Sequence, residues 1–167
     1  MILVYLIIAL FAAYCAVDDL ADIGSGRVIH HPVQWLIRAV VALAIVGIWW
    51  VGSEPHWTRV LFVTLACGPL FSLIFRLSLN RLRGKDWWYV SPSNLYDYLF
   101  MVLSGAAEWK PKRWGWKNYM AFLRHSHWNN MELNGNYVDG VKRAGTLATV
   151  VETVAFVVLA ALAVFVH

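Results

Sequence analysis

The chain has 167 residues, of which 60% are hydrophobic and 14% are charged, and its formal net charge is +4. Soluble domains carry about 25% charged residues, so this composition excludes an ordinary soluble enzyme or binding domain. It indicates a polytopic integral membrane protein of the all-α class, organised as a single membrane domain over 1–167.

Four stretches are predicted as transmembrane helices, because each offers about 20 predominantly apolar residues. In chain order they are 1–21, 33–52, 60–79 and 144–166. A cleaved signal peptide is the alternative for the first stretch, but no Lys or Arg precedes it and its cleavage pattern is poor, so an uncleaved helix is favoured. Cys15 and Cys67 fall within these stretches and are expected to be free thiols that pack as small apolar side chains.

The segment 80–143, between the third and fourth stretches, is predicted to form short interfacial or re-entrant helices on the inner side. The apolar part 95–107 is too short to span a bilayer and suits a re-entrant helix. From Trp114 to Trp128, apolar residues recur at helical spacing opposite Lys and Arg, which is typical of a helix lying on anionic lipid headgroups. The many Trp residues fit membrane-interface belts better than a stacking platform for nucleic acid, so no nucleic-acid partner is expected.

The distribution of basic residues predicts the orientation. If both termini lie outside, all Lys and Arg residues except Arg59 fall on the inner side, as the positive-inside rule requires. A crossing at 95–107 would move the basic cluster 110–143 outside and break this rule. We therefore expect both termini outside, in a bacterial inner membrane or a viral membrane.

Three charged residues inside the predicted spans are candidates for an intramembrane ion pair: Arg38, Arg76 and Glu152. At about 1.5 Å per residue, all three lie within roughly 12 Å of the inner boundary. An ionised side chain in hydrocarbon costs at least about 2.5 to 3.5 kcal/mol, so such residues usually face the bundle and pair. The sequence therefore predicts that Glu152 pairs with Arg38 or Arg76.

An acidic cluster, DDLAD, follows the first apolar run and contains Asp18, Asp19 and Asp22. Like charges at this spacing repel one another, so the cluster needs a cation. Arg27, Arg38, Arg76 and a metal ion are the alternatives, and pairing with arginine is favoured.

DDLAD also resembles the aspartate-rich motif of isoprenoid-diphosphate enzymes, whose carboxylates hold a Mg²⁺ that binds the diphosphate. The resemblance implies that Asp18, Asp19 and Asp22 hold magnesium. Phosphate charge would then be taken by Arg76, Arg81 and Arg83. The likeness covers five residues and no second acidic motif repeats it, so no cofactor is predicted, and magnesium belongs to this alternative alone.

Four histidines are further candidate metal ligands: His30, His31, His125 and His127. A dimetal membrane oxidase needs several imidazoles that converge from helix ends. His125 and His127 are two residues apart and would not share one face of a helix. Hydrogen bonding at the interface is the favoured role.

Three functions remain open at this stage. The favoured one is a non-enzymatic subunit or assembly partner of a larger membrane complex, with the segment 80–143 as its docking surface and with other membrane subunits or further copies of the chain as partners. The alternatives are a magnesium-dependent enzyme acting on a lipid or isoprenoid phosphate and, more weakly, a holin-like pore-forming oligomer.

Overall fold

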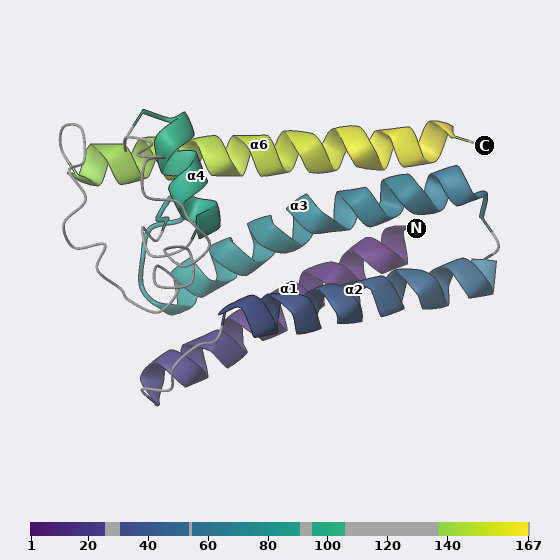
Figure 1. The fold of residues 1–167 in the computed structure, drawn as a ribbon, viewed down its shortest axis with the longest axis horizontal. Coiled ribbons are helices and arrows are strands. Elements are labelled where there is room, and N and C mark those ends of the chain that lie inside the picture. Colours follow the sequence, from purple (N-terminus) through teal and green to yellow (C-terminus); the bar gives the residue numbers. More distant parts are fainter. Residues whose placement is uncertain (26–30, 54, 91–94, 106–136, 167) are drawn as a thin grey trace, which may run out of the picture. The chain divides into compact units, whose positions relative to one another are not determined.

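The computed structural model describes residues 1–25, 31–53, 55–90, 95–105 and 137–166, and every regular element in them is an α-helix. The described elements are four long helices and one short one, drawn in Figure 1. Their bounds are Ile2–Gly24 for α1, His31–Ser53 for α2, Trp57–Leu82 for α3, Leu95–Leu103 for α4 and Tyr137–Phe165 for α6. The four long helices are each long and apolar enough to cross a membrane. The all-α class and the four candidate spans are thereby confirmed.

All four long helices extend beyond the apolar stretches that predict them, α2 by two residues at its start and one at its end. α1 continues past the acidic cluster to Gly24, α3 continues to Leu82, and α6 begins at Tyr137 rather than at 144. The difference has a simple cause. Apolarity marks the part of a helix that suits hydrocarbon, whereas the i to i−4 backbone hydrogen bonds continue until a residue ends them. Gly84, whose φ is +63°, lies just beyond the end of α3, and this conformation favours glycine.

Contacts divide the chain into two compact units. Unit 1 consists of Met1–Asp86 with Val151–His167, and unit 2 is Trp87–Val150. Within unit 1, α1 packs most extensively on α3, and α2 makes smaller contacts with both. Neighbours along the chain are therefore not the closest neighbours in space.

The core of unit 1 follows from the spacing of apolar residues on α1 and α3. The buried face of α1 presents Val4, Ile8, Ala12 and Cys15, which recur every three or four residues. This spacing places them on one side of a helix. They meet Val63, Cys67, Leu70 and Phe71 of α3 in a single cluster. Both cysteines are free and buried, as expected.

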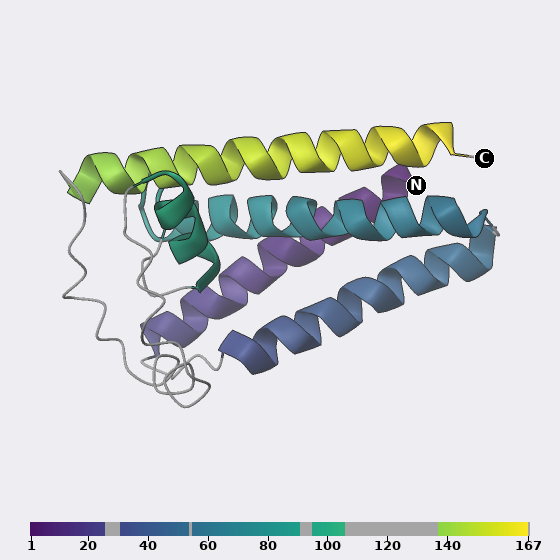
Figure 2. The same ribbon diagram turned by 45° about the horizontal axis from the view of Figure 1, so that its top comes forward.

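The helices of unit 1 run in alternating directions. Met1 at the start of α1, Ser53 at the end of α2, Arg59 near the start of α3 and Val164 near the end of α6 all line one cavity. Figure 2 follows the same helices in a second view. We call this end of unit 1 the Met1 end. Asp19, near the other end of α1, lies about five turns away along the helix.

Unit 2 contains a smaller core around α4. Phe100 and Met101 of α4 pack with Val90 and with the α6 residues Val141 and Ala144. α4 lies within the stretch predicted as re-entrant and has nine residues, too few to span a bilayer. Its placement in a membrane interface stays a prediction. The predicted amphipathic helix from Trp114 to Trp128 lies outside the described residues.

Within unit 2, Gly145 of α6 packs directly against the backbone of Trp88. A Cβ atom built on Gly145 would lie 1.5 Å from the carbonyl oxygen of Trp88. Real Cβ atoms do not approach oxygen so closely, so only glycine permits this contact. Gly145 therefore fixes how the segment at Trp88 lies on α6.

Candidate functional site

The first part of the candidate site is an ion pair between α1 and α2. Asp19 lies on the buried face of α1, one turn beyond Cys15, and is 3% exposed. Arg38 of α2 is also buried and donates hydrogen bonds from Nη1 to Oδ2 of Asp19, at 3.3 Å, and from Nη2 to Oδ1. This fork-to-carboxylate geometry is the strongest form of an arginine pair.

Aromatic and amide groups surround this pair. The guanidinium carbon of Arg38 lies 4.9 Å from the centre of the Phe75 ring of α3, a distance that allows a cation–π interaction. One turn from each member, Nε2 of Gln34 donates a long hydrogen bond of 3.5 Å to Oδ2 of Asp22. The Asp19–Arg38 pair thus connects α1, α2 and α3.

The second part is an ion pair between α3 and α6. Nη2 of Arg76 lies 2.5 Å from Oε2 of Glu152, and the hydroxyl of Ser72 donates to Oε1 of Glu152 at 2.6 Å. Glu152 is 1% exposed. Ser72 and Arg76 are four residues apart on α3, so they share a face and reach the same carboxylate.

Breaking either pair is expected to lower the stability of the folded protein substantially. Removing one member of a buried pair leaves an uncompensated charge and typically costs about 3 to 5 kcal/mol. Because each pair joins two different helices, such a change would act on packing between helices rather than on one helix alone. The two pairs therefore fix how the helices of unit 1 are positioned against one another.

The structure separates the three acids of the DDLAD cluster. Asp18 is exposed, Asp19 is buried against Arg38, and Asp22 is half-buried and contacts Gln34. Since the cluster is helical, Asp19 points about 100° away from Asp18 and about 60° away from Asp22. A magnesium ion held by all three would require Asp19 to leave Arg38.

The other candidate ligands are not brought together by the described residues. Within those residues, no group of three or more His, Cys, Asp and Glu side chains is placed to hold a metal ion. His31 begins α2, but its side chain lies outside the description, as do His30, His125 and His127 entirely. Metal ligation by these histidines stays a prediction.

The arginines proposed to take phosphate charge also differ in environment. Arg76 is buried with Glu152, whereas Arg81 is exposed in the last turn of α3 and Arg83 is half-buried just beyond it. Sequence reasoning missed Ser72, Gln34 and Phe75 as parts of the site. A signal for Ser72 exists, because it lies one helical turn before Arg76 and polar residues four apart share a face.

The described residues thus define an α-helical protein with four helices fit to cross a membrane and with the ion pairs Asp19–Arg38 and Arg76–Glu152 inside unit 1. The chain matches no family model, no curated protein and no solved structure. Its function must therefore be argued from these side chains.

Proposed function

We propose that this chain is a multi-pass membrane protein that acts as a non-enzymatic subunit or assembly partner of a larger membrane complex. The observation that carries the proposal is the sparse burial of α2 within unit 1. Of the α2 side chains that are described, only Arg38 and Val46 are buried. A helix that brings a charged side chain into the bundle yet buries so little else has a large face left for other contacts.

The exposed face of α2 is apolar and has open space at its glycines. Large apolar side chains on this helix are exposed, among them Val33, Leu36, Ile37, Val40, Leu43, Ile48 and Val51. A Cβ atom built on Gly47 or Gly52 would meet nothing within 4 Å. Small residues allow helices to approach closely in membranes, so this face suits a further transmembrane helix as well as lipid.

The part of α6 in unit 1 supports the same proposal. Glu152 and Ala163 are its buried residues, whereas Val154, Val157 and Val158 are exposed. The intramembrane charges are neutralised within unit 1 by their own partners. These charges therefore serve to position helices, and the outward faces are left to partner subunits, further copies of the chain or lipid tails. The basic, Trp-rich part of 80–143 is proposed as the docking surface on the inner side.

The test is the mass of the protein extracted from its native membrane in a mild detergent. We expect a particle larger than one chain with its micelle, containing a second membrane protein or further copies in fixed ratio. Gly47→Leu fills the open space on α2 and is expected to dissociate this particle. Gly68→Leu, at a glycine of α3 where a built Cβ also meets nothing within 4 Å, is the matched control and should leave the mass unchanged.

Other outcomes would replace the proposal. A monomeric particle with stoichiometric Mg²⁺ or Mn²⁺ that is lost when Asp18 and Asp22 are both changed to Asn would favour the lipid-phosphate enzyme. Ion leakage from liposomes that contain the purified protein would favour the pore. A monomer with neither property would contradict the assembly role outright.

A further inference from the structure

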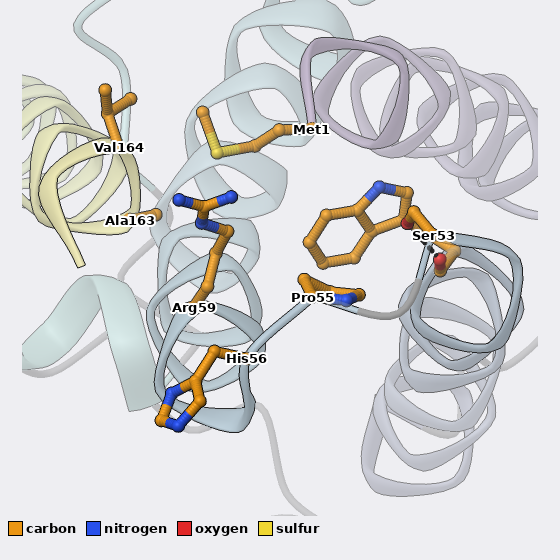
Figure 3. Close-up of a pocket in the computed structure, with 8 residues that line it drawn as sticks. Met1, Ser53, Pro55, His56, Arg59, Ala163 and Val164 are labelled. Atoms are coloured by element: carbon orange, nitrogen blue, oxygen red, sulfur yellow. Dashed lines mark hydrogen bonds between the residues drawn. The ribbon is translucent and has the colours of Figure 1, made fainter. Parts of the chain in front are cut away.

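A cavity of about 650 Å³ lies at the Met1 end of unit 1. Four chain segments form it: the start of α1, the end of α2, the connection to α3 with the first turn of α3, and the end of α6. Figure 3 shows Met1, Ser53, Arg59 and Val164 around it. Its volume falls in the range of about 300 to 1,000 Å³ that is usual for small-molecule sites.

Arg59 supplies a permanent positive charge to this cavity. Its Nε and Nη2 atoms donate to the carbonyl oxygen of Val166, at 3.2 and 3.0 Å. These bonds use one edge of the guanidinium and hold the side chain beside the end of α6. In Figure 3 the guanidinium lies between Met1 and Ala163.

Within the described residues, the other edge of the guanidinium, formed by Nη1 and Nη2, is open to a ligand. Within the described part of the chain, no carboxylate pairs with Arg59, in contrast to Arg38 and Arg76. Arg59 is half-buried, so its charge is partly removed from water. A planar edge with two N–H donors matches two oxygens of a phosphate group.

Tryptophans indicate the level of this cavity relative to a bilayer. Trp49 lines the cavity, and Trp50 and Trp57 are exposed at the same end of unit 1. Trp residues collect at the membrane–water interface, where their rings meet the headgroups. If the long helices span the bilayer, the open edge of Arg59 lies at the depth of lipid phosphates.

We propose that this cavity binds the phosphate group of a phospholipid, with Arg59 as the residue that recognises it. The carbonyl oxygen of Val166 orients the guanidinium. Ser53 at the cavity wall donates its hydroxyl to the carbonyl oxygen of Trp49, so its oxygen accepts from a hydroxyl of the headgroup. The apolar side chains of Met1 and Val164 accompany the first carbons of the lipid. This site is distinct from the acidic cluster and from the assembly faces of α2 and α6.

The experiment is native mass spectrometry of the intact protein released from detergent, with three probes added separately: phosphatidylglycerol, diacylglycerol with the same acyl chains, and inorganic phosphate. We expect the protein to retain phosphatidylglycerol and to lose diacylglycerol. Arg59→Gln should weaken phosphatidylglycerol binding by roughly tenfold, the usual effect of losing a hydrogen-bonded charge. Arg27→Gln, which removes the same charge from the connection between α1 and α2, is the matched control and should bind as the wild type does.

Each result decides the proposal. Equal retention of phosphatidylglycerol and diacylglycerol would overturn it without any variant, so a poorly folded Arg59→Gln protein would not prevent a decision. Equal losses in Arg59→Gln and Arg27→Gln would show general charge attraction and would also overturn it. Retention of inorganic phosphate without phosphatidylglycerol would assign the cavity to a soluble ligand and contradict the lipid. These outcomes are independent of the particle mass that tests the assembly role.

Discussion

The interiors of the two units are stabilised by different kinds of interaction. Unit 1 buries opposite charges between its helices, in the pairs Asp19–Arg38 and Arg76–Glu152. The described core of unit 2 packs apolar side chains around Phe100 and Met101, beside the buried Asp97 and a backbone contact at Gly145. Unit 1 therefore adds paired charges to its apolar core, whereas unit 2 adds a backbone contact that leaves no room for a side chain at Gly145. Removing a buried charge should therefore destabilise unit 1, whereas adding a side chain at Gly145 should destabilise unit 2.

The largest loss of unfolding free energy is expected for Glu152→Gln. This change removes the carboxylate and leaves Arg76 charged in a buried position, and the expected loss of unfolding free energy is about 3 to 5 kcal/mol. Reversible unfolding in mixed detergent micelles would measure it. Asp18→Asn, at an exposed acid of α1, is the control and should change stability by less than about 0.5 kcal/mol. Equal effects of the two changes would remove the distinction between paired and solvated charge.

The second-largest loss of unfolding free energy is expected for Gly145→Ala in unit 2. The added methyl group would lie 1.5 Å from the carbonyl oxygen of Trp88, so the backbone at Trp88 must move. We expect a loss of about 1 to 3 kcal/mol that appears as faster amide hydrogen exchange in α4. Gly68→Ala has no atom within 4 Å of its new Cβ and should be neutral or stabilising, by up to about 1 kcal/mol. Unchanged exchange in α4 for Gly145→Ala would refute the close approach.

A smaller effect is expected for Ser72→Ala. This variant keeps the Arg76–Glu152 pair but removes the hydroxyl that donates to Oε1 of Glu152 at 2.6 Å. A hydrogen bond to a charged group contributes about 1.5 to 3 kcal/mol, and the loss should lie at the lower end because Arg76 still neutralises the carboxylate. Thermal unfolding in detergent would compare it with Ser78→Ala on the same helix, for which little change is expected. A larger loss for Ser78→Ala would place the critical hydroxyl elsewhere.

Much of the helical architecture could be predicted from the sequence. Stretches of about 20 apolar residues located all four long helices, because a backbone in hydrocarbon must satisfy its own hydrogen bonds. Counting residues from the ends of the predicted spans also placed Arg38, Arg76 and Glu152 at similar depths. In the structure Arg76 pairs with Glu152. Reasoning from depth works because a charge near hydrocarbon needs a partner at a similar depth.

The choice between partners could not be predicted. Whether Glu152 meets Arg38 or Arg76 depends on how each helix is rotated and on which helices are neighbours, and the extensive packing of α1 on α3 has no signal in a single sequence. The contact between Gly145 and Trp88 also leaves no pattern, because it is made by backbone atoms. The same holds for Arg59, whose partner is the carbonyl oxygen of a residue 107 positions away.

The central claim is that unit 1 is held by charges paired within the bundle, and a double-mutant cycle on Arg76 and Glu152 tests it most directly. Arg76→Met and Glu152→Met should each destabilise the protein by about 3 to 5 kcal/mol, since each leaves one buried charge alone. The double variant replaces the pair by apolar side chains and should recover most of that loss. If the double variant instead loses the sum of the two single losses, the residues act independently and the account is contradicted.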